Sequence, residues 1–376
     1  MLNHIKPNFN KFEIDCGKIQ GFIYQGDLKS EIRIKNITKI QAVQILENML
    51  MIRELEEMIV KLRSGVYDPI IDYSYRGPTH VSIGQEASAV GVSTGLNIFD
   101  KITSTHRGHG DSMAKGTSAI FSMNKSELSS RLSKNINQSI DLLLEEVLED
   151  HVFKTIAELF GKEAGYCKGR GGSMHIADFS VGHLGANAIV GGGVPIATGA
   201  ATGLRYLKNK EIVCCFAGDG AYANGVTLES LNWANQFQFT NHFAGENAFG
   251  LPIIFIIQNN HYGMTGRADN EVMGVTRLAR RGVGFSENNM HAEVVNGMDV
   301  LSVYDAIKRS SEKCRNGEGP VLLELDTYRY YGHSLSDPRN EYRKREEEND
   351  WKKIDPIENY KIQLLESKIT NKKEIQ

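Results

Sequence analysis

Long hydrophobic runs are missing from this chain of 376 residues. The longest, such as residues 252–257, are far shorter than the roughly 20 apolar residues that a transmembrane helix needs. Residues 1–12 have no apolar core of the kind that secretory signals carry, and they lack the arginine-rich character of a transit peptide. We therefore expect a protein that does not span a membrane and that works in the cytoplasm.

Cysteine is scarce, and neither sign of charge is in excess. Five cysteines are too few for a disulfide framework, and burial rather than pairing is expected for the adjacent Cys214 and Cys215. The 43 Lys+Arg against 46 Asp+Glu give no basic surface of the kind that binds nucleic acid. The remaining composition, 41% hydrophobic and 24% charged, is ordinary for a globular protein with a sizeable core.

Short apolar segments alternate with helical patterns along most of the chain. Strands are expected at residues 18–24, 101–105, 211–217, 252–258 and 320–326, and helices at 38–63, 85–96, 196–207 and 227–237. Because these strands are apolar for much of their length, both faces of the sheet should be covered. The pattern predicts an α/β fold with a doubly wound, mostly parallel sheet. We expect an N-terminal extension at 1–37 and one domain at 38–376, with a helical insertion at about 118–150 and a loop insertion at about 239–250.

Polar residues follow two of the predicted strands directly. Gly218-Asp219-Gly220 comes after one strand, and Asn259-Asn260 comes after another. One carboxylate, one amide oxygen and one backbone carbonyl, for which Tyr262 is placed, are the hard ligands that Mg²⁺ uses when phosphate and water supply the rest. The glycines would let main-chain N–H groups approach phosphate oxygens, next to the N-terminus of the helix expected from residue 227. The alternative is two unrelated turns, since Gly, Asn and Asp are common in turns.

These residues and four further segments carry a resemblance to a known family. Residues 218–260 resemble the thiamine diphosphate motif, and their neighbours resemble the alpha subunits of pyruvate and acetoin dehydrogenases. The other segments are THVSIGQEA (79–87), TSTHRGHGDSMAKG (103–116), GKEAGYCKGRGGSMHIADFSVGHLGANAIVGGG (161–193) and YRYYGHSLSDPRNEYRKR (328–345). The THRGHG and KGRGGSMHIAD stretches are closer to the acetoin type.

The resemblance implies a role for each matching residue. Asp219 and Asn260 would bind Mg²⁺, and Arg107 would contact the diphosphate of the cofactor. His333 would lie beside the diphosphate and the reacting carbon, and His80 and His106 would line the substrate end, where many relatives carry Tyr in place of His106. Cofactor contacts are expected from Ala188, Val190, Gly218, Gly220 and Ala221, with main-chain groups of Ala188 and Val190 receiving the aminopyrimidine.

The implied chemistry needs more than this chain. The cofactor would cleave pyruvate, another 2-oxo acid (including branched ones) or acetoin, and the acyl unit would pass to lipoamide. The resemblance implies a beta subunit that supplies an activating glutamate, an assembly of two alpha and two beta chains, and a lipoyl-bearing acyltransferase as the downstream partner. Two other functions stay open, a binder that has lost catalysis and an NAD-dependent oxidoreductase. The second is disfavoured because no Gly-x-Gly-x-x-Gly opens a helix after the first strand.

Several other motifs have plainer interpretations. His106 and His109 could be taken for a metal pair, but no Cys or acid completes a zinc pattern around them. The glycine-rich stretch at 168–172 lacks the Gly-Lys-Ser/Thr of a P-loop, and we interpret it as a flexible loop near the entrance of the active site. Residues 337–338 and the charged run 343–348 are interpreted as a loop and a solvated helix. Ala223 stands where relatives often have Asn or Ser, so one polar contact to the diphosphate is expected to be missing.

Overall fold

One parallel sheet organises the chain. The computed structural model describes residues 7, 9–67, 80–132, 138–236 and 250–375. Seven strands form this sheet in the order β1-β6-β7-β5-β4-β2-β3, and every pairing between them is parallel. They are β1 (Gln20–Gly21), β2 (Lys101–Ser104), β3 (His183–Ala186), β4 (Val213–Gly218), β5 (Ile253–Asn259), β6 (Glu293–Asn296) and β7 (Val321–Asp326). The predicted α/β fold is confirmed.

The inner strands are apolar because helices cover both of their faces. Along β4, Cys215 and Ala217 face a core shared with α7 (Gly193–Tyr206) and α8 (Gly225–Ala234). Cys214 and Phe216 face a core shared with α3 (Glu86–Gly95) and α10 (Val300–Arg315). This alternation is the two-residue period of a strand. Cys214 and Cys215 are both buried and free, as predicted. The strands predicted at 101–105, 211–217, 252–258 and 320–326 are all present, with ends within two residues of those expected.

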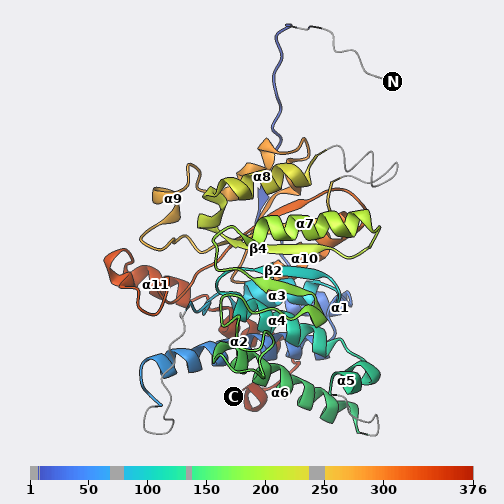
Figure 1. Ribbon diagram of the computed structural model, residues 1–376, viewed down its shortest axis with the longest axis vertical. Helices are drawn as coiled ribbons and strands as arrows, with labels where there is room; N and C mark the ends of the chain where they lie inside the picture. Colours follow the sequence, from blue (N-terminus) through green and yellow to red (C-terminus); the bar gives the residue numbers. More distant parts are fainter. Residues whose placement is uncertain (1–6, 8, 68–79, 133–137, 237–249, 376) are drawn as a thin grey trace.

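Helices lie on both sides of the sheet, and a further layer covers one side. Figure 1 shows α7 and α8 on one side of β2 and β4, and α3, α4 and α2 on the other. The helices are α1 (Leu28–Arg33), α2 (Lys39–Arg63), α3 (Glu86–Gly95), α4 (Gly108–Phe121), α5 (Lys125–Arg131), α6 (Ile140–Leu159), α7 (Gly193–Tyr206), α8 (Gly225–Ala234), α9 (Ala268–Glu271), α10 (Val300–Arg315), α11 (Arg345–Lys352), α12 (Pro356–Glu366) and α13 (Lys372–Ile375).

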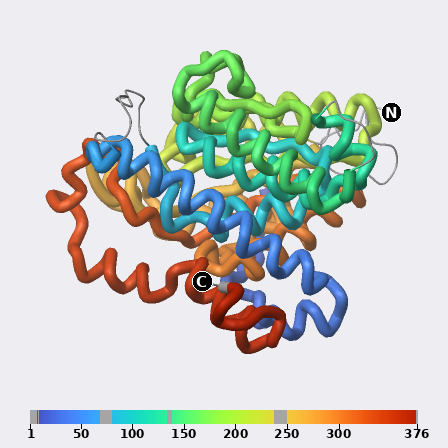
Figure 2. Tube along the Cα trace, turned by 90° about the horizontal axis from the view of Figure 1, so that it is seen from below, coloured from blue at the N-terminus to red at the C-terminus, as the bar shows by residue number. Residues whose placement is uncertain are grey.

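The outer layer is built on α2, whose start the sequence predicted. Thr38 and Gln41 form a capping box at its first turn, which satisfies N–H groups that have no partner inside the helix. In the view from below, α2 runs diagonally in front of the other helices, and the C-terminal helices, in red, lie below it (Figure 2). Ile45, Met49 and Ile52 are its buried stripe in a core shared with α3, α4 and α12.

The N-terminal segment and the helical insertion are both packed against the domain. β1 pairs with β6 at the edge of the sheet, and Leu28 and Ile37 are buried in the same core as α2. The predicted insertion at about 118–150 spans the end of α4, α5 and the first turns of α6, where Ile120, Leu128, Leu143 and Val147 form a small core. Residues 239–249 of the predicted loop insertion lie outside the described residues. Across the segments that are described, no helix is long and apolar enough to cross a bilayer.

Candidate cofactor and substrate site

A cavity of about 390 Å³ lies at the carboxyl ends of the central strands. Residues that directly follow β2, β4 and β5 line it, together with the segment before α7 and part of the chain after β7. Ligands bind at this edge of open α/β sheets because the loops there diverge to either face. Its lining includes the predicted Arg107, Val190, Gly218, Asp219, Gly220, Ala221, Asn260, Tyr262, His106 and His333.

Asp219 and Asn260 follow adjacent strands and line this one cavity. β4 and β5 are hydrogen-bonded neighbours, with Gly218 paired to Gln258, so the two side chains leave the same edge of the sheet. Oδ1 of Asp219 accepts a bond of 2.7 Å from the Gly220 N–H, whereas Oδ2 is buried and has no hydrogen-bond partner among the described residues. Burial raises the pKa of Asp219 to about 6. A buried carboxylate oxygen without a partner is costly, so these residues fit a bound cation.

The side-chain oxygen of Asn260 and the carbonyl oxygen of Tyr262, the other two oxygens expected as Mg²⁺ ligands, both accept hydrogen bonds from one arginine. The Asn260 amide donates to Oε1 of Gln85 at 2.9 Å, which holds its Oδ1 in one orientation. Arg329, buried and not expected from the sequence, donates to that Oδ1 at 3.0 Å and to the Tyr262 carbonyl at 3.3 Å. Burial, followed by repulsion from Arg343, lowers the pKa of Arg329 to about 10. Its guanidinium therefore fixes the orientation of two carbonyl-type oxygens of residues that line the same cavity as Asp219.

The backbone after β4 is open to the cavity. A Cβ atom added to Gly218 or Gly220 would meet no atom within 4 Å, so free space adjoins the main chain there. A 3-10 helix, Asp219–Ala223, follows, and α8 begins at Gly225 rather than near residue 227. Asn224 caps α8 and donates to the Val190 carbonyl at 3.1 Å. Val190 lines the cavity, but Ala188 is not among its lining residues.

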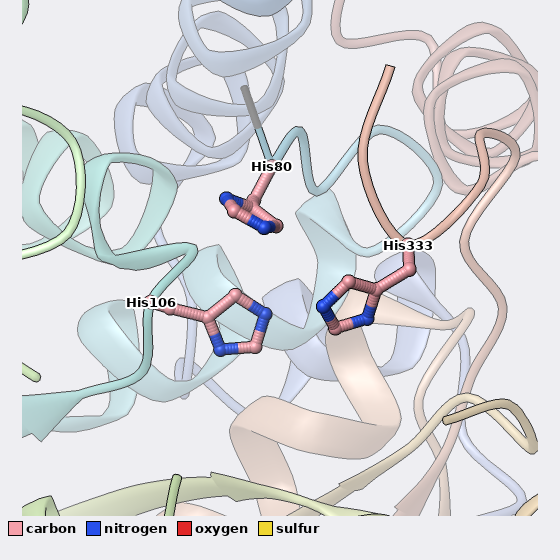
Figure 3. Close-up of side chains that lie close together, drawn as sticks. All are labelled: His80, His106 and His333. Atoms are coloured by element: carbon pink, nitrogen blue, oxygen red, sulfur yellow. The ribbon is translucent and has the colours of Figure 1, made fainter. Parts of the chain in front are cut away.

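Three histidines from distant segments meet at one end of the site; His106 and His333 line the cavity, whereas His80 contacts their rings but is not among the lining residues. The ring centroids of His80 and His106 are 4.9 Å apart, and each lies 5.2 Å from that of His333. Figure 3 shows the three rings facing a common space. Burial, then the charge of Arg107, lowers the pKa values to about 4 for His80, about 2 for His106 and about 3 for His333. All three rings are therefore uncharged at neutral pH.

Arg107 is fixed between two of these segments. Its Nη1 donates to the Val81 carbonyl at 2.8 Å and its Nη2 donates to the His333 carbonyl at 2.7 Å. Burial and the nearby Arg329 lower the pKa of Arg107. Arg107 is only 5% exposed and lines the cavity. Its positive charge therefore faces a bound ligand, and its two hydrogen bonds keep the side chain in that position.

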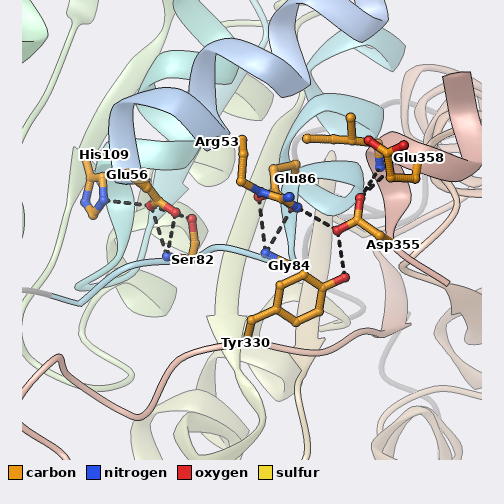
Figure 4. Close-up of polar contacts among 10 residues, drawn as sticks. Arg53, Glu56, Ser82, Gly84, Glu86, His109, Tyr330, Asp355 and Glu358 are labelled. Atoms are coloured by element: carbon orange, nitrogen blue, oxygen red, sulfur yellow. Dashed lines mark hydrogen bonds and ion pairs between the residues drawn. The ribbon is translucent and has the colours of Figure 1, made fainter. Parts of the chain in front are cut away.

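His109 is separated from His106 by the fold. Its Nε2 lies 2.7 Å from Oε1 of Glu56, and the Glu56 carboxylate also accepts from the Ser82 N–H and hydroxyl (Figure 4). The alternative of a metal pair made by His106 and His109 is thus not realised. Glu56 instead fixes the segment that follows His80.

A second network fixes the chain that carries His333. Arg53 bridges Glu86 and Asp355 at 2.6 and 2.9 Å, and the Tyr330 hydroxyl donates to Asp355 at 2.9 Å (Figure 4). Gly84, whose N–H donates to Glu86, has a φ of +103°, and a Cβ there would lie 2.5 Å from the Tyr328 carbonyl. The segment after β7 is therefore held in place by contacts with α2, α3 and the start of α12.

Two interpretations of loops are corrected by these contacts. The 168–172 stretch is not a flexible loop at the entrance: it lines no part of this cavity, and the buried Glu158 carboxylate accepts four N–H bonds from Cys167, Gly169, Gly171 and Gly172. The charged run 343–348 is not wholly solvated. Arg343 is buried, stacks over Tyr262 at 4.3 Å and donates to the Arg329 carbonyl at 2.8 Å.

Comparison with known proteins gives one family and several relatives. The family model of the dehydrogenase E1 component matches residues 72–376. The alpha subunit of acetoin:2,6-dichlorophenolindophenol oxidoreductase from Bacillus subtilis is 35% identical over 337 residues, covering 90% of this chain and 84% of the relative. The testis-specific mitochondrial pyruvate dehydrogenase E1 component subunit alpha of Rattus norvegicus is 33% identical over 340 residues, covering 90% and 72%.

Proposed function

The chain belongs to the dehydrogenase E1 component family, and from this premise we propose that it is the alpha subunit of a thiamine diphosphate-dependent dehydrogenase. It cleaves pyruvate or another 2-oxo acid, or acetoin, and the acyl unit passes to lipoamide. The observation that carries the proposal is the unpartnered, buried Oδ2 of Asp219 beside the fixed oxygens of Asn260 and Tyr262. A diphosphate-bound Mg²⁺ takes only a few oxygens from a protein, because phosphate and water supply the rest.

Each proposed cofactor contact has a local basis. Asp219, Asn260 and the Tyr262 carbonyl hold Mg²⁺, and the open backbone at Gly218, Gly220 and Ala221 receives the diphosphate. The fixed guanidinium of Arg107 adds a charge that suits phosphate oxygens. Main-chain groups of Ala188 and Val190 receive the aminopyrimidine. For Val190 this is supported by its place in the cavity lining and by the hydrogen bond from Asn224 to its carbonyl, whereas Ala188 is proposed from the resemblance alone, because it does not line the cavity.

When bound, thiamine diphosphate supplies a nucleophilic carbon that adds to the substrate carbonyl and accommodates the electron pair left by carbon–carbon cleavage. The part of this chain is to place and polarise the substrate. A neutral imidazole has one donor and one acceptor nitrogen, so His333 donates a hydrogen bond to the carbonyl oxygen while His80 or His106 accepts a hydrogen bond from the substrate. The three rings are partly buried, so they are positioned beside the reacting groups with limited contact with solvent.

The complete catalyst needs a second chain. We propose a beta subunit that brings the activating glutamate, an assembly of two alpha and two beta chains, and a lipoyl-bearing acyltransferase that takes up the acyl unit. The names of the relatives describe them as alpha subunits, which accords with a partner chain. We propose a cytoplasmic location, which the free state of the five cysteines favours.

Dye-coupled turnover tests the proposal. The purified chain is assayed alone and with its beta partner, with Mg²⁺, thiamine diphosphate and a panel of acetoin, pyruvate and 3-methyl-2-oxobutanoate. We expect turnover only for the pair, and the preferred member of the panel assigns the substrate. Full activity of this chain alone contradicts the subunit assignment, and no activity of a cofactor-saturated pair on any member contradicts the proposed reaction.

A further inference from the structure

We propose that His80, His106 and His333 form a binding site for a divalent transition metal of the Zn²⁺ class, and that metal bound there closes the substrate end of the cavity. Each histidine offers one ring nitrogen, and the three nitrogens lie within 4.8 Å of one another. In a tetrahedral zinc site with Zn–N bonds of about 2.0–2.1 Å, ligand nitrogens lie roughly 3.3 Å apart. Small side-chain rotations are enough to close the difference.

The state of the rings favours a metal. Nδ1 of His80 and Nε2 of His106 are buried and have no hydrogen-bond partner within the described segments. Leaving such atoms unpaired costs free energy that coordination would recover. The rings converge from three separate segments in Figure 3, so the backbone already holds them near one point. Two networks, through Glu56 and through Arg53, fix the segments that carry His80 and His333.

The site differs from the magnesium site in the chemistry of its ligands. Imidazole nitrogen suits Zn²⁺, Co²⁺, Ni²⁺ and Cu²⁺, whereas Mg²⁺ takes oxygen ligands. A cell or buffer rich in Mg²⁺ therefore leaves the three histidines free. The protein supplies three ligands and leaves a fourth position open, as metal sites with exchangeable ligands do.

Two neighbouring charges, those of Arg107 and Arg329, limit the affinity. Nη2 of Arg107 lies 3.5 Å from Nδ1 of His333, so the metal must use the other nitrogen of that ring. Because Arg107 is held by two carbonyls, it cannot withdraw, and its charge repels a divalent ion. We expect reversible, inhibitory binding rather than the permanent binding of a structural zinc.

The binding part of this inference stands apart from the proposed function, and only the inhibition part rests on it. The full-length chain in excess Mg²⁺ is titrated with Co²⁺, and visible d–d absorption is recorded. We expect one equivalent to give a saturable low-symmetry spectrum that Zn²⁺ abolishes. His106→Ala should weaken binding at least about tenfold, as loss of one of three ligands implies.

Two variants serve as controls. His175→Ala, which removes an exposed histidine outside the cluster, should bind Co²⁺ like the parent chain. Asp219→Asn should lose Mg²⁺-dependent thiamine diphosphate binding but keep the Co²⁺ spectrum, which assigns the metal to the histidines. A spectrum that survives His106→Ala in a folded variant, or no saturable binding at all, overturns the inference.

Inhibition is measured on the alpha–beta pair. Zn²⁺ should raise the apparent KM for substrate, and a Zn²⁺-selective chelator added in excess Mg²⁺ should restore it. Retained Co²⁺ binding without any turnover by the pair contradicts the proposed function alone. Turnover that Zn²⁺ leaves unchanged contradicts the inhibitory role alone.

Discussion

Asp219 and Asn260 each stand directly after one of two adjacent parallel strands, β4 and β5, and both side chains line the same cavity. A metal shared by the two residues requires this arrangement. Side chains that left opposite edges of the sheet could not have met. The arrangement follows from parallel strands of matched register, whose carboxyl ends lie at one edge.

Replacing Asp219 by Asn should weaken Mg²⁺-dependent binding of thiamine diphosphate roughly 100-fold, because an amide has no charge to offer the ion. The same change should stabilise the ligand-free chain at pH 7. A pKa of about 6 against an ordinary 3.8 means that ionised Asp219 costs the fold up to ~3 kcal/mol above pH 6. Calorimetric titration and urea unfolding measure the two effects.

The pH dependence of the second effect has a definite sign. A carboxyl group whose pKa is raised in the fold binds its proton more tightly there, so the parent chain gains stability as pH falls from above 6 toward 3.8. The Asn variant lacks that gain. Cofactor affinity equal to that of the parent chain would contradict the metal assignment, and equal unfolding free energies at pH 7 would contradict the cost of the buried charge.

A second prediction concerns the histidine cluster and acid. Burial and Arg107 lower the pKa of His106 to about 2, so the fold keeps this ring neutral while the unfolded chain gains a proton below 6.5. Because protonation then favours the unfolded chain, the free energy of unfolding is highest above pH 6.5 and decreases as the pH falls. Between pH 6.5 and 5 the loss is up to ~2 kcal/mol.

His106→Tyr should remove that part of the pH dependence, because Tyr does not titrate in this range. Unfolding free energies at pH 7 and pH 5 measure it, with His175→Tyr as an exposed control that leaves the difference unchanged. If parent chain and His106→Tyr lose the same stability on acidification, His106 is not the group held neutral.

Most of the fold could be predicted from local sequence because the inner strands are short and apolar on both faces. The residues after them were then placed at one edge by the parallel pairing alone. β3 and β6 escaped prediction because they are only four residues long and carry polar or small residues, such as His183 and Gly185 in one and Glu293 and Asn296 in the other. Such segments become strands through pairing with a neighbour, not through their own pattern.

The parts of the site that the sequence did not predict depend on tertiary contacts. In the sequence, Arg329 is one residue of a Tyr-rich segment and shows no sign of a role. Only the fold, which places the end of β7 beside that of β5, brings it into contact with Asn260 and Tyr262. In the same way, the THRGHG motif does not reveal that His109 turns to Glu56 while His106 turns to His80. No spacing along the chain encodes these choices.

Glu158→Gln should loosen the loop that follows α6. The buried carboxylate accepts four backbone N–H bonds at 2.7 to 3.1 Å, and an amide would turn an N–H₂ group toward two of those donors. Leaving two buried N–H groups without acceptors costs on the order of 2–4 kcal/mol. Trypsin should then cut faster after Lys168 and Arg170.

Glu163→Gln, at an exposed position of the same loop, should leave the cleavage rate unchanged. Equal cleavage rates for both variants and the parent chain would show that Glu158 does not hold the loop.

Gly84→Ala should disturb the segment that carries His333, and a second glycine provides its control. Gly84 has a φ of +103°, and its Cβ would lie 2.5 Å from the Tyr328 carbonyl and 3.0 Å from the Tyr330 ring. Backbone strain and the clash together should lower the unfolding free energy by more than about 2 kcal/mol. They should also raise the KM for substrate, since Tyr330 lies only a few residues before His333.

Gly199→Ala, in α7 with open space around it, should instead stabilise the protein by roughly 0.5–1 kcal/mol because alanine restricts the unfolded chain and favours helix. Urea unfolding of both variants checks the pair: a loss at Gly199 as large as at Gly84 would mean that the positive φ and the Tyr328 carbonyl are not the cause.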